Sequence, residues 1–313
     1  MKGKWWRLSL MQTSSDVYMV NNLVIHLKSE MSWREAMKSK IMKKNMIKCT
    51  ALVLTIMTAI GLAGCGKNSK SDLEYVKDKG TLVVGLDDTF APMGFRDKDD
   101  KLVGFDIDLA RAVTKKMGVK VKFQPIDWSA KEGELKAKNI DCVWNGMSAT
   151  PDRQKSMSLS NKYLKNRILI MSLDPNVKVN SADDLKNIKI GTQADSSALE
   201  AIKKSDKYKE FKNNISEYKT YDEAILDMKA GRIKAVAIDE VYAIYNNKNK
   251  DKLYESPFNF GADYYAVGFR KGDTKLTKEF NKAFKEVIDS GEAQKISEKW
   301  FGKNLVVFEG YDK

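Results

Sequence analysis

Histidine is almost missing from this sequence, and cysteine is scarce. The 313 residues include one histidine, His26, and three cysteines, at positions 49, 65 and 142. These cysteines are not spaced as zinc ligands or as a redox pair. If the N-terminal segment that contains His26 is absent from the working protein, no histidine remains. Ser–His and Cys–His nucleophilic catalysis and most zinc chemistry are then excluded.

A compact basic surface for nucleic acid is also lacking. The net charge is +13, but the first 64 residues hold ten basic and three acidic residues of the 55 and 42 in the chain. The remainder therefore holds 45 and 39, a net charge of +6, with both signs alternating as in "KKSDKYKEFKNN" (203–214). We expect a solvated surface and no nucleic-acid partner. No GxxxxGK[ST] motif is present, so no ATP site is expected.

The apolar run near the N-terminus is too short for a membrane span, which needs about 20 residues. From Met42 the chain reads "MKKNMIKCTALVLTIMTAIGLAGCGKNSKS". Lysines, an apolar stretch and small residues follow one another, which is the layout of an export signal. We expect a signal over 42–64 and a polar tether over 65–72. The alternative is a plain membrane anchor that happens to carry a cysteine.

Residues 1–41 precede this signal, although an export signal should begin near the N-terminus. We expect translation to start at or near Met42 and this leader to be absent from the native protein. The rival interpretation is a genuine extension with a role of its own.

Short apolar runs alternate with helical patterns along the rest of the chain. Residues 81–86, "TLVVGL", predict a strand, and 105–117 predict a helix that Gly118 ends. The alternation continues through "AVAID" (235–239) and closes with two helices, over 276–291 and 292–302. This pattern predicts an α/β fold with largely parallel sheets, and about 240 residues suit two lobes better than one.

Several motifs occur together in a characteristic order. They are "LAGC" (62–65), "GFDIDLARAV" (104–113), "GMSATPDR" (146–153), "VAID" (236–239) and "KWFG" (299–302). The first resembles a bacterial lipobox, which implies that Cys65 receives a diacylglyceryl group and becomes the new N-terminus. Between residues 73 and 302 the chain resembles the bacterial extracellular solute-binding proteins of family 3, the amino-acid-binding proteins of ABC importers.

The resemblance implies a two-lobed periplasmic-binding-protein-like fold of type II, with two hinge strands and a discontinuous first lobe. Lobe 1 would comprise 73–167 and 266–313, and lobe 2 would comprise 168–265. An amino acid would bind in the cleft, and the lobes would close over it.

Arg153 could bind the ligand carboxylate, because its planar guanidinium offers two parallel hydrogen bonds. The family uses this arginine as a clamp; the alternative is a surface ion pair with Asp152 or a neighbouring residue. Ser196 and Ser197 begin a predicted helix, whose free N–H groups suit a carboxylate, although Ser196 could simply cap it. Asp195 stands where the family usually has glycine, and its charge near an anion site is a departure.

Asp239 ends the strand "AVAID" and matches the family's ammonium-binding aspartate; the alternative is a helix cap. Ser148 and the carbonyl of Gly146 would supply further acceptors. For the ligand side chain, the resemblance suggests aromatic walls from Phe90 and Trp128, each of which could instead belong to the core.

Asp87 matches a position that touches ligand side chains, and we place Glu132 near it. Two acids favour a polar or cationic ligand. Trp144 and Asn145 either line the cleft or pack beneath it, and Cys142 is expected to be a buried apolar residue.

We therefore expect a lipid-anchored extracytoplasmic receptor, of Gram-positive type and monomeric, that captures a polar L-amino acid or a cystine-like ligand. It would pass the ligand to ABC permease subunits in the membrane, without cofactor or metal and without enzymatic activity. One alternative is a cleft-based enzyme such as a cyclohexadienyl dehydratase, with Glu132 or Asp87 as the acid. Another is an adhesin or sensor module.

Overall fold

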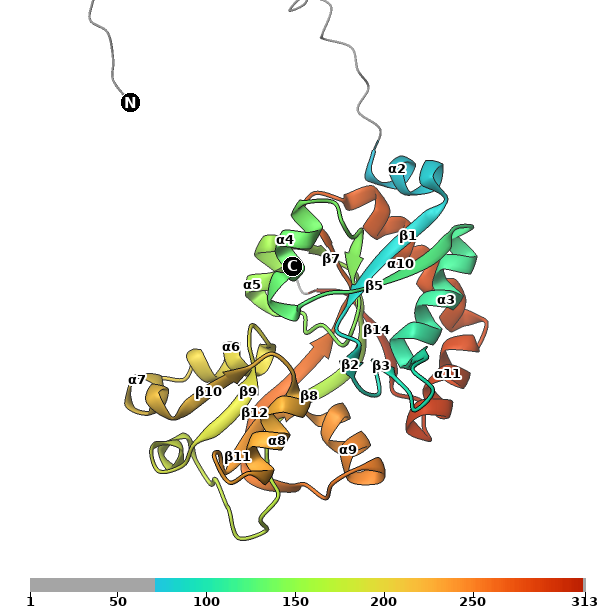
Figure 1. Cartoon of the computed structure of the whole chain (residues 1–313). Helices are drawn as coiled ribbons and strands as arrows, with labels where there is room; N and C mark the ends of the chain where they lie inside the picture. The colour runs from blue at the N-terminus through green and yellow to red at the C-terminus, as the bar shows by residue number, and fades with distance from the viewer. Residues whose placement is uncertain (1–70, 312–313) are drawn as a thin grey trace, which may run out of the picture. The chain divides into compact units, whose positions relative to one another are not determined.

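The computed structural model describes residues 71–311 and contains two lobes, each built on one main sheet (Figure 1). The first lobe has the strand order β5 (Lys120–Pro125), β1 (Thr81–Leu86), β6 (Cys142–Val143), β13 (Gly268–Arg270), β7 (Met157–Leu159). The second has the order β10 (Ile215–Tyr218), β9 (Ile190–Gln193), β11 (Ala235–Asp239), β8 (Lys162–Ser172), β12 (Tyr254–Tyr265), and β14 (Val306–Glu309) pairs with β8. A small sheet in the first lobe contains β2 (Thr89–Phe90), β3 (Gly94–Arg96) and β4 (Leu102–Val103).

The helices follow the same division between the lobes. Those of the first lobe are α2 (Asp72–Lys79), α3 (Phe105–Met117), α4 (Lys131–Lys136), α5 (Pro151–Ser156), α10 (Thr274–Asp289) and α11 (Glu292–Phe301). Those of the second lobe are α6 (Ser197–Lys203), α7 (Tyr208–Phe211), α8 (Tyr221–Lys229) and α9 (Glu240–Asn249). The expected α/β class is therefore confirmed.

The sheets are mixed, so the expectation of largely parallel sheets is wrong. β1 pairs in parallel with β5 and β6, and β9 pairs in parallel with β10 and β11. In contrast, β13 is antiparallel to β6 and β7, and β8 is antiparallel to β11 and β12. These two strands enter their sheets from the other lobe through short links, without the crossover helix that a parallel connection requires.

The chain passes between the lobes twice. β7 ends at Leu159 and β8 begins at Lys162, while β12 ends at Tyr265 and β13 begins at Gly268. β8 and β12 lie antiparallel, with Leu164 opposite Tyr265. Two adjacent strands thus form the hinge, and the first lobe is discontinuous, as expected. The predicted lobe boundaries, between residues 167 and 168 and between residues 265 and 266, remain predictions.

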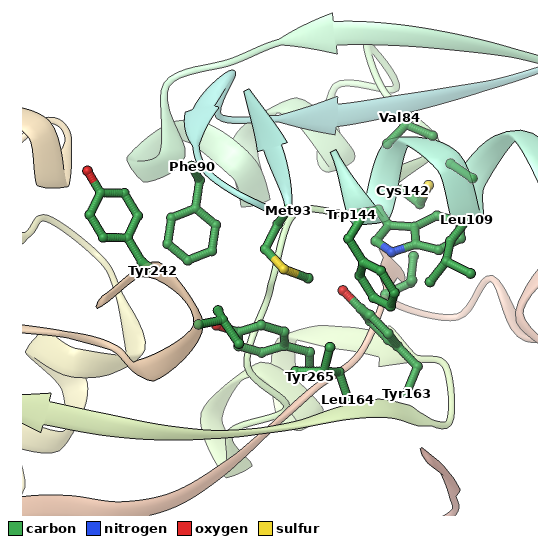
Figure 2. Packing of buried hydrophobic residues seen from close by; sticks show 14 of the residues in the cluster. Val84, Phe90, Met93, Leu109, Cys142, Trp144, Tyr163, Leu164, Tyr242 and Tyr265 are labelled. Atoms are coloured by element: carbon green, nitrogen blue, oxygen red, sulfur yellow. The ribbon is translucent and has the colours of Figure 1, made fainter. Parts of the chain in front are cut away.

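The core of the first lobe forms around the predicted helix. α3 buries Ile107, Leu109, Ala110, Val113 and Met117, and it ends at Gly118, whose φ of 69° is left-handed. Figure 2 shows Leu109 beside Trp144 and Cys142, which come from the end of β6. Cys142 is buried and unpaired, and burial raises the pKa of its thiol well above the ordinary value, so it acts as a small apolar side chain.

The predicted leader, signal and tether up to residue 70, and with them Cys65, lie outside the described residues. Within residues 71–311, no helix combines the length and apolar character needed to cross a bilayer.

Candidate functional site

A cavity lies between the two lobes. Both lobes contribute side chains, and most of them come from loops at the ends of strands or the starts of helices. The lining residues are Asp87, Phe90, Trp128, Asn145, Gly146, Arg153, Gln193, Ser196, Ser197, Tyr221 and Asp239. The structure therefore brings eight of the nine predicted binding residues together, and Ser148 lies behind them.

Arg153 provides the only cation among the lining residues. Thr150 caps α5 by accepting the Arg153 N–H, which fixes the backbone from which the side chain extends. Arg153 is 5% exposed; its Nη1 donates to the Ser148 carbonyl at 3.0 Å and its Nη2 to the Asp195 carbonyl at 3.2 Å. No carboxylate within residues 71–311 forms an ion pair with it. The alternative of a pair with Asp152 is therefore wrong for the described part of the chain.

Asp239 lies at the end of β11, where it is 4% exposed. It occupies the N-cap position of α9, but its side chain does not cap the helix. Instead, Oδ1 accepts from Asn166 Nδ2 at 2.7 Å and from Tyr265 Oη at 2.6 Å, and Oδ2 accepts from Tyr221 Oη at 3.1 Å. All three donors are neutral. Burial, and secondarily the charge of Asp263, raises the pKa of Asp239 to about 7.

The start of α6 faces the same cavity. The hydroxyl of Ser196 caps this helix by accepting the Leu199 N–H at 3.1 Å, and Ser197 is its first residue. Ser148 Oγ lies 2.8 Å from Ser197 Oγ and 2.5 Å from Asp263 Oδ2. Because a carboxylate can only accept, the Ser148 proton goes to Asp263 and Ser197 donates to Ser148. Ser148 thus connects the lobes behind the cavity rather than facing into it.

Gly146 must be glycine for steric reasons. Its φ is +59°, and a Cβ at this position would lie 2.5 Å from Phe90 Cε1. Its N–H donates to Asp106 Oδ2 at 2.7 Å, and this aspartate also accepts from Tyr163 Oη at 2.8 Å. Burial raises the pKa of Asp106 to about 7. This aspartate of the "GFDIDLARAV" motif therefore fixes the backbone at the cavity wall.

Two aromatic residues, Phe90 and Trp128, line the cavity. The Phe90 and Tyr242 rings are nearly parallel, with centroids 5.8 Å apart, and Figure 2 shows them side by side. Tyr221 is a second neighbour of Phe90, at 5.9 Å. Trp128 lies beneath two cations, with Lys131 Nζ 5.1 Å and Arg153 Cζ 5.9 Å from its ring centroid.

Asp87 contributes a second carboxylate to the lining. It accepts from Thr89 N at 2.9 Å, from Thr89 Oγ1 at 2.7 Å and, across the cleft, from Gln193 Nε2 at 2.7 Å. Burial raises its pKa. Like Asp239, it forms no ion pair with a cation of residues 71–311.

The sequence argument missed Gln193 and Tyr221 and left Asn145 undecided. Gln193 ends β9 next to β11, which Asp239 ends, so the shared sheet edge was a usable signal. Tyr221 begins α8 and offered no such signal. Asn145 lines the cavity at 2% exposure, and both polar atoms of its amide lack a partner among the described residues. Trp144 packs beneath, in the core.

Glu132 was expected near the ligand and does not line the cavity. It is exposed and accepts from Ser156 Oγ at 2.9 Å. The preceding residue, Lys131, is the one that α4 turns into the protein, because neighbouring helical residues point about 100° apart. Lys131 forms an ion pair with Asp195, so the unexpected charge at 195 is neutralised by the other lobe.

Two α/β lobes joined by two strands, with a polar cavity between them, define a binding protein of the type II periplasmic-binding-protein class. A family model supports this over residues 82–303, and the chain belongs to the bacterial extracellular solute-binding proteins, family 3.

Known relatives agree with this assignment. The chain is 31% identical over 263 residues to the L-cystine-binding protein TcyJ of Escherichia coli, covering 81% of this chain and 96% of TcyJ. It is 32% identical over 260 residues to the arginine-binding extracellular protein ArtP of Bacillus subtilis, covering 82% and 98%.

Solved structures are similar as well. Tv2483 bound to L-arginine superposes with a TM-score of 0.70 at 26% identity, covering 75% of this chain and 96% of Tv2483. The ancestral amino acid-binding protein AncCDT-1, a precursor of cyclohexadienyl dehydratase, gives 0.66 at 32% identity, covering 74% and 100%.

Proposed function

We propose that this protein captures a free amino acid in the cleft between its lobes. One observation carries the proposal: a buried guanidinium and a buried carboxylate, Arg153 and Asp239, line the same cavity, and neither forms an ion pair within residues 71–311. Buried charges are costly unless they are paired. The α-carboxylate and α-ammonium of one zwitterion would pair with both.

The remaining charge of the cavity favours a cationic ligand side chain. With Arg153 and Asp239 neutralised by the zwitterion, Asp87 is the one charged lining group left over. A guanidinium or ammonium group on the ligand side chain would balance it. Asn145 would contribute an acceptor that has no partner within residues 71–311. We therefore infer a ligand of the arginine, lysine or ornithine type, in keeping with the names of ArtP and Tv2483.

A cystine-like ligand is the second candidate, because TcyJ is a relative. Asp87 could take its second ammonium group. The second carboxylate of cystine would have no cationic partner, because Arg153 is the only cation among the lining residues and would bind the first carboxylate. The charge balance thus favours the cationic amino acids over cystine.

Thermal unfolding of the full chain with each of the twenty amino acids, ornithine and cystine tests the proposal. We expect arginine, lysine or ornithine to raise the melting temperature and glutamate and aspartate to leave it unchanged. At a hundredfold excess over Kd the stabilisation is about 2.7 kcal/mol, or roughly 5–10 °C. Agmatine, which lacks the α-carboxylate, is the matched control and should have little effect. If no amino acid shifts the transition, the proposal is wrong.

We propose binding without catalysis. The alternative enzyme would use Glu132 or Asp87 as a general acid. Glu132 lies outside the cavity, and Asp87 is held by Thr89 and Gln193. Formation of an aromatic product from prephenate or arogenate by the purified protein would contradict this part of the proposal.

We also propose that the protein is a monomer, is anchored to the outer face of a bacterial membrane through a lipid on Cys65 and delivers its ligand to an ABC permease. The motif "LAGC" and the polar tether after it support the anchor. More than one acyl chain is needed for stable attachment, as a diacylglyceryl cysteine with an acylated N-terminus would provide.

The intact mass of the membrane-bound protein tests the anchor, and the intact mass of the unprocessed precursor tests the predicted start at or near Met42. We expect a polypeptide that begins at Cys65 and carries lipid, and a Cys65→Ser variant that is not lipidated. A mature species that retains Trp5 and Trp6 would show that both predictions are wrong.

A further inference from the structure

Two charged residues at the boundary between the lobes lie outside the ligand contacts described above. Lys131 belongs to α4 of the first lobe, and Asp195 precedes α6 of the second. The Lys131 side chain is 2% exposed and that of Asp195 is 56% exposed. Lys131 Nζ forms an ion pair with Asp195 Oδ2, and it also donates to the carbonyls of Asp195 at 3.2 Å and Trp128 at 3.3 Å.

Without Asp195, the charged ammonium group of Lys131 would be unfavourable in this buried position. Burial lowers the pKa of Lys131, and so does the neighbouring charge of Arg153, whereas the contacts with Asp195 raise it. Two of the three acceptors of Nζ belong to the opposite lobe. When the lobes separate, these acceptors move away and water replaces them. This ion pair can therefore form only when the cleft is closed.

The backbone of Asp195 also takes part. Its φ of +56° is left-handed, a conformation that aspartate and asparagine tolerate better than most residues. Its carbonyl accepts from both Lys131 Nζ and Arg153 Nη2, each at 3.2 Å. A glycine could adopt this conformation and offer the same carbonyl, but it would not supply a carboxylate. The aspartate thus adds a charge contact between the lobes to an existing backbone contact.

We propose that Lys131 and Asp195 form an inter-lobe latch that stabilises the closed cleft and slows the release of the bound ligand. Its effect on release rests on the proposed function; its effect on closure does not. A contact made only in the closed state shifts the open–closed equilibrium by its own free energy. Because ligand enters while the lobes are apart, the latch acts on dissociation rather than on association.

The test replaces Asp195 by asparagine, which keeps the left-handed backbone and its carbonyl and removes the charge. Stopped-flow tryptophan fluorescence of the full chain with L-arginine follows binding through Trp128. We expect dissociation to become about tenfold faster, with an unchanged association rate. Asp152→Asn is the matched control, because it removes a 3.1 Å inter-lobe pair with Lys204 whose side chains are both about half exposed. Equal dissociation rates in the two variants overturn the latch.

A second variant covers the case in which the unpaired lysine prevents folding. Lys131→Met leaves no charge buried, since Asp195 is largely solvated, and we expect the same faster dissociation. If the wild-type protein binds no amino acid, the proposed function fails, and the latch is then judged in ligand-free protein by small-angle X-ray scattering. We expect a larger radius of gyration for Lys131→Met than for wild type; equal radii overturn the latch.

Discussion

Replacing Arg153 by alanine is expected to abolish amino-acid binding. The substitution removes the single cation that lines the cavity and leaves the ligand carboxylate buried with no ionic partner. Truncating one member of a buried, hydrogen-bonded charge pair costs about 4 kcal/mol, or roughly a thousandfold in Kd. Isothermal titration calorimetry with L-arginine should therefore detect no heat of binding at concentrations that saturate the wild-type protein.

Two further variants show whether the loss of ligand binding is caused by removing the Arg153 guanidinium. Arg153→Lys keeps the charge but not the planar fork, so we expect binding that is weakened but measurable. Arg111→Ala removes a half-exposed arginine of α3 that pairs with Asp108 at 3.4 Å, and it should bind like wild type. Near-native affinity of a folded Arg153→Ala protein would refute the assignment of Arg153 to the ligand carboxylate.

Asp239→Asn is expected to weaken binding by about a hundredfold, because a neutral amide cannot pair with the ligand ammonium. The same calorimetric titration measures the change. Asp183→Asn is the control, since it removes an exposed carboxylate of the second lobe that pairs with Lys186 at 2.9 Å. An affinity that is equal in the two variants would mean that Asp239 serves only the hydrogen-bond network of Asn166, Tyr221 and Tyr265.

The pH dependence of binding provides an independent measure of the role of Asp239. Burial raises its pKa from the ordinary 3.8 to about 7, so the ligand-free protein carries a proton there at lower pH. A ligand ammonium binds the ionised carboxylate, and the proton must leave. Affinity should therefore fall as pH decreases below 7, by up to about tenfold per unit. The affinity should depend less on pH in Asp239→Asn, and any pH dependence that remains should come from Asp87.

Stability of the ligand-free protein should change in the opposite direction. Between pH values of about 4 and 7 the folded state holds protons on Asp239 and Asp106 that the unfolded state has lost. The free energy of unfolding therefore decreases as pH rises through this window. Ligand reverses this trend for Asp239 but not for Asp106, which lies behind the cavity wall.

Local sequence patterns and the family resemblance were enough to predict the fold class, the main elements and most of the residues that line the cavity. The apolar periodicity of 105–117 and the glycine after it fixed α3, since a helix buries a stripe and stops where the chain can turn left-handed. Polar residues directly after apolar runs, such as Asp239 after "AVAI", identified strand ends. The motif "GMSATPDR" pointed to Arg153 through its resemblance to the family, in which an arginine at this place binds the ligand carboxylate with its planar fork.

The interaction partners of these residues could not be predicted, because they depend on contacts between distant parts of the folded chain. Whether Asp239 caps α9 or faces the cavity depends on Asn166 and Tyr265, which lie 73 and 26 residues away along the chain. Whether residue 131 or 132 points inward depends on the rotation of α4, which the packing of the lobe sets. The charge of Asp195 is neutralised by Lys131, 64 residues away. Local pattern fixes what a residue can do, but burial and pairing arise from long-range contacts that local pattern does not encode.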